Sequence, residues 1–452
     1  MSDGSTDGET SSGRGATESE WTQSRRAFLA AGASVSAVSL VGCLGGDGGT
    51  PTETDSGDGG DDETATPTAT ATENYPDEVV IGSIHPLSGS TSYVGTRLHQ
   101  AIKFAAKRVN DNGGIESMGG ATVTVIKGDH KNDPTTGGEV ARELIDQGAD
   151  MLTGTYSSPV ASSVAQVAET QQVPFVIDIA ADTSILQERD LQYTYRAQPN
   201  SRSQSLDAVE GIMALTDQAD ITIETAGLFY IDNTYGEAYR DALTEAFEER
   251  GVEVVADTTI SFGGTADTQV TKFRETDPDV IVPTVFTRQA LELVSSMQDQ
   301  DYWPKVLAAC ASGGMNSENF KKMGEVINGE LSAGYQIDMT QDRVTEINEA
   351  YQETYDTAPM KGNVGMAYST GEVLVEAFAE AGSVSPDALI STLDEIEVSD
   401  HVMAMPPITF DDSHENANGL TITNQVQDME AKVVYPEEWA TAELNPDTIG
   451  RN

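Results

Sequence analysis

Residues 79–84 have the sequence Val-Val-Ile-Gly-Ser-Ile, and the fold is predicted from this run and the segment that follows it. A continuous apolar run of this kind is typical of a strand buried on both faces of a parallel sheet. The next segment places apolar residues along one face of a helix, namely Leu98, Ile102, Ala105 and Val109. That helix is expected to end near Gly113, because glycine commonly follows the last helical turn.

The same alternation of strand and helix repeats along the chain in two series. Further strands are expected at 121–127, 150–153, 174–179, 225–230, 253–260, 280–283 and 306–309. Helices are expected at 135–147, 159–172, 235–250, 269–275 and 289–300. A last part departs from the alternation, with helices at 343–355, 364–381 and 386–393 and a hairpin at 420–426 and 430–435. Two such series predict an α/β protein with two Rossmann-like lobes, each built on a helix-covered parallel sheet.

Residues 24–43 contain two export signals in order. Arg25 and Arg26 precede an apolar run of roughly 15 residues, which is shorter than the ~20 that span a bilayer. Paired arginines before such a run indicate a twin-arginine signal. Residues 40–43, Leu-Val-Gly-Cys, resemble a lipobox, where the chain is cut before the cysteine and the thiol receives a lipid. The alternative is a chance apolar stretch. We therefore expect residues 1–42 to be a signal and the protein to be exported folded, then held on the extracellular face of the membrane through Cys43.

Residues 43–77 are rich in Gly, Thr, Asp, Pro and Glu. Such a segment buries too little apolar surface to repay the entropy of ordering, so a disordered acidic stalk is predicted. The whole chain carries 74 acidic and 25 basic residues, a formal net charge of −49. In dilute buffer these like charges repel one another and destabilise the compact state. At molar salt the Debye length falls to ~3 Å, so this repulsion largely vanishes. The charge indicates a halophilic surface, as in haloarchaea, and it argues against a nucleic-acid partner.

Signatures of catalysis and of cofactors are weak. The five histidines show no metal-ligand spacing and are expected in surface or loop positions, and the acidic run 411–415 is expected to be a solvated loop. No G-x-G-x-x-G after a strand, no Walker A sequence and no G-x-S-x-G elbow occurs. With Cys43 assigned to the lipid, Cys310 has no disulfide partner and is expected to be a buried thiol. We therefore assign no catalytic residue, no metal and no cofactor.

Ligands of open parallel sheets bind beyond the carboxyl ends of the strands, and four loops there carry suitable residues. The first two loops supply Ser90, Tyr93, Tyr156, Ser157 and Ser158. The other two supply Ala181, Asp182, Thr183, Tyr235 and Phe286. With Pro159 at the first helical position, Ser158 is expected to cap a helix whose free N–H groups suit a carboxylate or a polarised carbonyl. Asp182 either accepts from a ligand ammonium or amide or caps the next turn, and the aromatic rings either cover a ligand or pack at an edge.

The chain resembles type I substrate-binding proteins of ABC transporters, in the leucine/isoleucine/valine-binding family, over roughly residues 79–435. The resemblance rests on several short motifs in the family's order: 86–89 with Gly95, 110–115, Asp129 with 133–134, 154–158, Asp232 with 235–236, and 367–368. It implies two lobes joined by three crossing strands, near 196–200, 331–335 and 410–413. Lobe one would then comprise 78–198 with 333–411, and lobe two 199–332 with 412–452.

The resemblance also implies roles for single residues. Ser157 matches the serine that binds the ligand carboxylate. Ala181 and Asp182 match a backbone carbonyl and a threonine of the ligand shell, while Tyr235 and Phe286 match rings of lobe two. The sequence departs from the family near Cys310, where the acid that binds the ligand ammonium is missing, and it lacks the family disulfide. Either Asp182 takes over the ammonium or the ligand carries none.

These observations predict a monomeric solute receptor that delivers a branched-chain or other amino acid to an ABC permease and its ATPase. Three alternatives stay open: a binder of amides or urea, a ligand-sensing subunit with the same fold, and a surface hydrolase. The hydrolase would need a base aligned with a nucleophile, and the sequence offers no such pair.

Overall fold

The computed structural model describes residues 75–187, 189–312 and 317–450. The expected export signal, Cys43 and nearly all of the expected stalk lie outside these residues. Among the described residues, no helix combines the length and the apolar character that a bilayer crossing requires.

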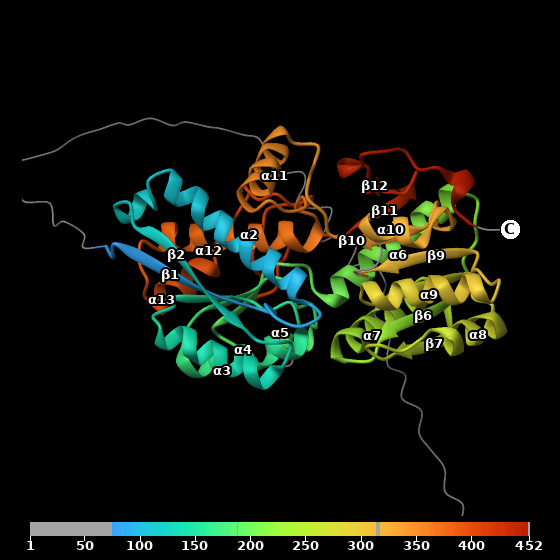
Figure 1. The fold of residues 1–452 in the computed structure, drawn as a ribbon, viewed down its shortest axis with the longest axis horizontal. Coiled ribbons are helices and arrows are strands. Elements are labelled where there is room, and N and C mark those ends of the chain that lie inside the picture. The colour runs from blue at the N-terminus through green and yellow to red at the C-terminus, as the bar shows by residue number, and fades with distance from the viewer. Residues whose placement is uncertain (1–74, 188, 313–316, 451–452) are drawn as a thin grey trace, which may run out of the picture. The chain divides into compact units, whose positions relative to one another are not determined.

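The first sheet has five parallel strands in the order β2-β1-β3-β4-β5. Its strands are β1 (Glu78–His85), β2 (Thr122–Asp129), β3 (Met151–Gly154), β4 (Phe175–Ile177) and β5 (Thr194–Arg196). The helices around it are α2 (Ser92–Asp111), α3 (Pro134–Asp146), α4 (Ser158–Gln171), α5 (Ser184–Gln187), α11 (Asp342–Tyr355), α12 (Gly362–Ala381) and α13 (Pro386–Leu393). This sheet and these helices form the first lobe (Figure 1).

The second sheet has seven strands in the order β12-β11-β10-β9-β8-β6-β7. Its strands are β6 (Thr225–Ile231), β7 (Glu253–Ile260), β8 (Val280–Thr284), β9 (Val306–Cys310), β10 (Leu331–Gly334), β11 (Ile422–Gln427) and β12 (Glu430–Tyr435). The second lobe adds α6 (Ser201–Gln218), α7 (Thr234–Glu249), α8 (Asp267–Thr276), α9 (Thr287–Asp299) and α10 (Ser317–Met323). Five strands run parallel, and the predicted hairpin β11–β12 joins β10 antiparallel.

The opening run forms β1 as expected, and its side chains alternate between the two faces of the sheet. Val79 and Ile81 belong to the apolar core shared with α2 and α12, whereas Ile84 belongs to the core shared with α3 and α4. All three side chains are fully buried. Helices on both faces therefore explain why this strand has a continuous apolar run instead of an alternating pattern.

Helix α6 was not expected from the sequence, and its buried face explains why. The helix begins after Asn200, whose side chain accepts a hydrogen bond from the backbone N–H of Ser203. Its inward face opens with polar residues, because Ser201, Gln204 and Ser205 are at most 1% exposed. The apolar periodicity that signals an amphipathic helix is consequently weak over its first two turns.

The chain passes between the lobes three times, as the resemblance implied. The first passage joins β5 to α6, the second joins β10 to α11, and the third leads into β11. The first and third passages are tied to each other, because the N–H of Arg196 donates to the carbonyl of His414 at 2.9 Å. The second passage is tied to the segment after α13, where the N–H of Asp338 donates to the carbonyl of Val402 at 2.8 Å. The two-lobed α/β fold with three crossings is thus confirmed, whereas the lobe boundaries at 198, 332 and 411 stay predictions.

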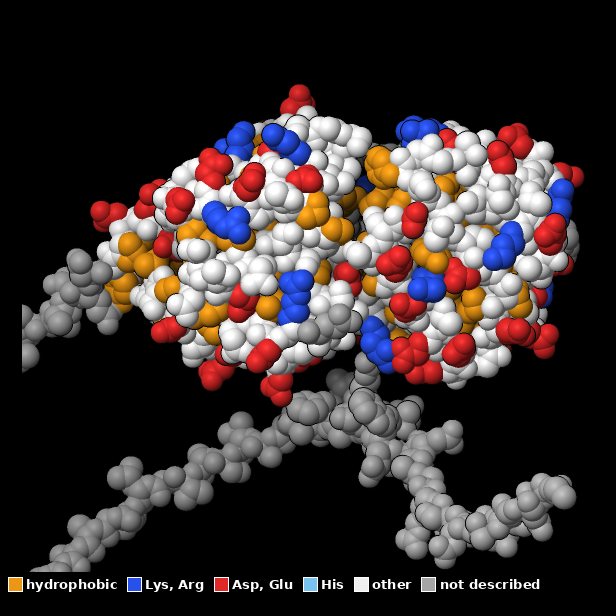
Figure 2. Space-filling model, turned by 90° about the horizontal axis from the view of Figure 1, so that it is seen from below, with side chains coloured by type: hydrophobic (Ala, Val, Ile, Leu, Met, Phe, Trp, Pro, Cys, Tyr) orange, Lys and Arg blue, Asp and Glu red, His pale blue; other side chains and the backbone are white. Residues whose placement is uncertain are grey.

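Acidic side chains are scattered over the face seen in Figure 2, with fewer Lys and Arg among them. They lie over the elements of both lobes, as expected from a sequence in which Asp and Glu are spread along the chain. Many acidic charges are therefore carried by the folded lobes themselves.

Candidate functional site

Three loops meet at the carboxyl edge of the first sheet, because β1, β3 and β4 are neighbours in it. His85 ends β1, residues 154–158 follow β3, and residues 178–182 follow β4. The N–H of Asp178 donates to the carbonyl of Gly154 at 2.9 Å, so the last two loops lie side by side. The parallel sheet thereby places the predicted ligand loops together.

The loop 154–158 has a tightly fixed backbone. Gly154 has φ +135°, and a Cβ there would lie 2.0 Å from the carbonyl oxygen of Ile84, so only glycine fits. Tyr156 adopts the left-handed conformation with φ 66°, which is unfavourable for a bulky residue. The His130 ring donates from Nε2 to the carbonyl of Thr155 at 2.8 Å, and this hydrogen bond helps to hold the loop in place. This backbone fixes where the Tyr156 ring leaves the chain.

One histidine corrects the expectation of surface or loop positions. His85 is fully buried and ends strand β1, with its Nε2 2.7 Å from the carboxylate of Asp178, whereas His130 lies in the loop after β2, as expected, although it too is fully buried. Burial lowers the pKa of His130 to about 4, so this ring is neutral at neutral pH. Both rings act within the scaffold of the ligand loops.

Helix α4 begins one residue earlier than expected. Its N-cap is Ser157, and Ser158 is the first helical residue. Ser158 is nearly fully buried, and its hydroxyl accepts from the N–H of Asp182 at 3.4 Å, so the expectation that Ser158 caps the helix is wrong. The Ser157 side chain makes no capping hydrogen bond. The Ser157 residue and the first-turn N–H groups of α4 lie at the same end of the helix, and this end favours negative or polarised groups.

The loop 180–184 is engaged in internal contacts. The Asp182 carboxylate accepts from the N–H of Ser184 at 3.0 Å, as in the capping alternative, and the carbonyl of Thr183 accepts from the N–H of Gln187 at 3.0 Å. The carbonyl of Ala181 accepts from the N–H of Ser201 at 2.7 Å and from Arg196 Nη1 at 3.3 Å. Ala181 and Asp182 therefore lie at the expected place, where they also hold the start of α5 and the first passage.

Rings from both lobes come together next to α4. Phe286 stacks on Tyr235 with centroids 5.7 Å apart and an interplanar angle of 14°, and it lies 6.3 Å from the ring of Tyr156. The exposed ring of Phe262 meets Phe286 edge-on at 6.2 Å. Burial raises the pKa of Tyr156 to about 12, so its phenol stays neutral and can donate a hydrogen bond. Three of the predicted residues are thus brought into one aromatic group.

Two other predicted residues lie apart from this group. Ser90 is exposed, and Tyr93 is 57% exposed. The ring of Tyr93 faces the guanidinium of Arg97, 5.6 Å from the ring centroid. Among the described residues, no ring contact or hydrogen bond joins Ser90 or Tyr93 to the aromatic group.

The structure adds residues that the sequence did not indicate. Tyr335 follows β10 at the second passage, and its hydroxyl donates to Asn363 Oδ1 at 2.8 Å. Burial raises the pKa of Tyr335, and the negative charge of Asp178 raises it further. Asp178 was hidden inside an expected strand, 174–179. The sequence signal that could have identified Asp178 as a candidate is a charged residue within an otherwise apolar run.

Cys310 is a free, fully buried thiol at the end of β9, as expected, and burial raises its pKa. The phenol of Tyr235 donates to the carbonyl of the next residue, Ala311, at 2.6 Å. Within the described part of the chain, no three His, Cys, Asp or Glu side chains are placed to hold a metal ion.

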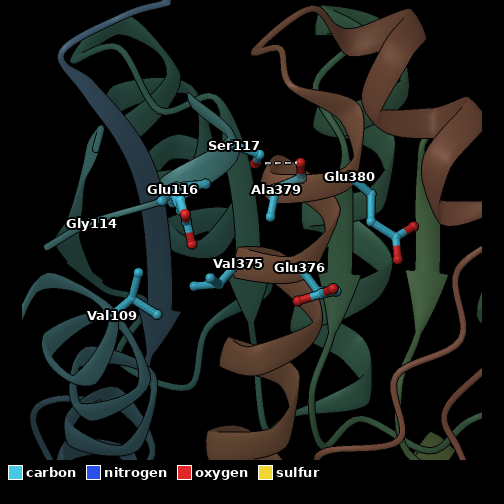
Figure 3. A pocket seen from close by; sticks show the side chains of 9 residues that line it. Val109, Gly114, Glu116, Ser117, Val375, Glu376, Ala379 and Glu380 are labelled. Atoms are coloured by element: carbon cyan, nitrogen blue, oxygen red, sulfur yellow. Dashed lines mark hydrogen bonds between the residues drawn. The ribbon is translucent and has the colours of Figure 1, made fainter. Parts of the chain in front are cut away.

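A hollow of about 540 Å³ lies elsewhere on the first lobe (Figure 3). It has apolar side chains such as Val109 and Val375 and acidic ones such as Glu116, Glu376 and Glu380, and Ser117 Oγ donates to the carbonyl of Ala379 at 2.7 Å beside them. Val109 is near the far end of α2, roughly 25 Å along the helix from the residues that follow β1. The hollow is therefore separate from the ligand loops.

The fold defines the class of protein. A leucine-binding protein from Thermotoga maritima superposes with a TM-score of 0.67 and 18% identity, covering 82% of this chain and 99% of that one. A solute-binding protein of an ABC transporter from Rhodopseudomonas palustris, in complex with 3,4-dihydroxybenzoic acid, also gives a TM-score of 0.67 and 18% identity, covering 79% and 95%. This is the fold of the type I periplasmic binding proteins.

Sequence comparison leads to the family. The chain belongs to the periplasmic binding protein family, which matches residues 78–429. The Leu/Ile/Val-binding protein homolog 8 of Brucella abortus is 25% identical over 385 residues, covering 81% of this chain and 93% of that protein. The relatives are binding proteins, not enzymes, and membership implies an extracellular or periplasmic location.

Proposed function

We propose that this protein captures an amino acid, with a branched-chain side chain as first candidate, and delivers it to the permease and ATPase of an ABC importer. The observation that carries the proposal is the meeting of Tyr156 of the first lobe with Tyr235 and Phe286 of the second. A solute that packs against these rings contacts both lobes at once, so its binding favours the arrangement in which the lobes face each other. The protein acts as a monomer.

The α4 end supplies the polar half of the site. The Ser157 hydroxyl and the first-turn N–H groups would bind the solute carboxylate, and the rings would bind its side chain. This division matches the general design of small-molecule sites, where apolar walls give affinity and a few polar groups fix orientation. Ala181, Asp182 and Thr183 border the same place, whereas Ser90 and Tyr93 would contribute only after a rearrangement.

We further propose a lipid anchor on Cys43, export in the folded state through the twin-arginine signal, and adaptation to molar salt. The acidic stalk would then let the lobes reach a permease in the same membrane. A binder of amides or urea is the alternative for the solute, because no acid stands at Cys310 or Ala311. A ligand-sensing subunit with the same fold would have the same solute site as an importer component and would differ from it only in its partner protein.

The test is a thermal-shift screen of amino acids, amides and urea against the purified mature protein at molar salt, followed by equilibrium dialysis. A solute at about 100 times its dissociation constant should stabilise the protein by about 2.7 kcal/mol. Dialysis should recover one unaltered solute molecule per protein. Recovery of a chemically changed solute would instead favour the hydrolase. Absence of a shift with every amino acid would refute the proposed solute.

A further inference from the structure

One oxygen of a fully buried carboxylate lacks a partner at the candidate site. Asp178 is 0% exposed and directly follows β4. Its Oδ2 lies 2.7 Å from His85 Nε2, whereas its Oδ1 has no hydrogen-bond partner in the described part of the protein. A buried carboxylate oxygen without a donor is costly, and native structures rarely leave one without a reason.

The partner on the other oxygen is held in place by a chain of hydrogen bonds. Ser83 Oγ lies 3.0 Å from Nδ1 of His85 and 3.0 Å from Nδ1 of His99. The hydroxyl has one proton, so one of the two rings must donate to Ser83. Burial lowers the pKa of His99 to about 3, so this ring is neutral. The arrangement that satisfies every group has His99 donating to Ser83, Ser83 to His85, and His85 Nε2–H to Asp178.

Asp178 lies between the ligand loops of the first lobe. Its backbone N–H donates to the carbonyl of Gly154 at 2.9 Å, at the start of the loop that carries Tyr156, and the segment 178–182 that it opens follows β4. The unpartnered oxygen therefore belongs to a residue at the carboxyl edge of the first sheet, where the candidate site lies. Asp182, by comparison, already accepts from the backbone of Ser184.

We propose that Oδ1 of Asp178 accepts an N–H donor of the solute, an ammonium or an amide, and that His85 is a positioning residue for it. The inference rests on the proposed function, because it concerns the same site. It narrows the solute to compounds that bring such a donor. Bare carboxylates without a donor, such as the benzoate found with one structural neighbour, would leave this oxygen unpaired.

The first experiment uses the unaltered mature protein and pairs of probes that differ in the donor. L-Leucine is compared with 4-methylpentanoate, which lacks only the ammonium, and isobutyramide is compared with isobutyrate. Titration calorimetry at molar salt should show that at least one N–H probe binds at least about tenfold more tightly than its partner, since a buried polar group discriminates strongly against a ligand that leaves it unpaired. Equal binding within both pairs would overturn the inference.

The second experiment changes the carboxylate. Asp178→Asn keeps the shape and removes the charge, and it should weaken the N–H probe by about tenfold or more. The matched control is Asp129→Asn at the same edge of the sheet, where Oδ1 accepts from the backbone of Leu87 at 2.8 Å and of Lys131 at 3.0 Å. The control should retain its affinity. Unchanged affinity in Asp178→Asn would overturn the inference, and the probe pairs decide the question if this variant does not fold.

To test the positioning role of His85, we need a measurement that a general loss of folding or affinity would leave unchanged. His85→Gln keeps an N–H donor for Asp178, whereas His85→Leu removes it. The ratio of the affinities for leucine and 4-methylpentanoate should survive in the Gln variant and fall toward one in the Leu variant. A loss of both affinities by the same factor would refute positioning. Binding of benzoate alone would overturn the inference and leave solute binding in place, whereas retention of no solute would overturn both.

Discussion

Removing the carboxylate of Glu415 tests the first passage between the lobes. Glu415 lies 3.0 Å from Arg196, and the two side chains are 5% and 0% exposed. Arg196 also donates to the backbone carbonyls of Ala181 and Asp182, and its Nε has no partner among the described residues. The variant Glu415→Ala would therefore leave a buried guanidinium with two neutral acceptors.

The expected loss of stability is large because the charge cannot reach water. Breaking a buried ion pair from one side costs about 3–5 kcal/mol, of which most is the penalty for the stranded charge. Burial raises the pKa of Glu415, and Arg196 opposes this shift. The cost of removing Glu415 from water therefore already offsets part of its attraction to Arg196. We accordingly expect the loss of stability to lie toward the lower end of that range.

Urea unfolding at about 1 M and about 3 M NaCl measures the loss. Salt screens exposed charges but has little access to a buried pair, so the loss in Glu415→Ala should be similar at both concentrations. The matched control is Glu245→Ala, whose partner Arg202 and own side chain are each 46% exposed. The control should change stability by less than about 1 kcal/mol. A loss below about 1 kcal/mol in Glu415→Ala at both salts would refute the reasoning.

Three further outcomes are expected. Ser157→Ala and Tyr235→Ala should each weaken binding of the solute by about tenfold or more without unfolding the protein, and calorimetry showing wild-type affinity in both would contradict the site. Cys43→Ser should move the mature protein from the membrane fraction to the soluble fraction, and unchanged partitioning would count against the lipid. Burial raises the pKa of Glu372 to about 8, so between about pH 4.5 and 8 the folded protein holds a proton that the unfolded chain releases. Stability should therefore fall by a few kcal/mol as pH rises through this window, and Glu372→Gln should flatten the fall, whereas parallel pH profiles would disprove it.

Most strands and most helices could be predicted because apolar periodicity and end signals agree there, whereas the short strand β5 was not expected. The run 79–84 is buried on both faces, and α7 starts where Asn233 caps it, with its side chain accepting from the N–H of Gly236 at 3.0 Å. Helix α6 could not be predicted, since its buried face opens with Ser201, Gln204 and Ser205. Its polar face is set by tertiary neighbours that no local pattern reveals.

The candidate site was predicted where residue type and loop position sufficed. Tyr156, Tyr235 and Phe286 follow strand ends, and parallel topology brings them together. The capping residue of α4 was wrong by one position, because a Ser-Ser-Pro sequence fits two starts equally well. The partnership of Asp178 with His85 spans 93 residues and two strands, so it exists only once the sheet has formed.

The route of the chain has a consequence for biosynthesis. Leu331 of β10 pairs with Gln425 of β11, and the first lobe receives α12 only after the whole parallel part of the second sheet has been made. The first lobe therefore lacks its last helix until residue 393 has been made, and the second sheet lacks β11 and β12 until residue 435 has been made. Slow, non-local assembly of this kind leaves open strand edges in the meantime. Under the folded export proposed above, this non-local assembly would be finished before the protein crosses the membrane.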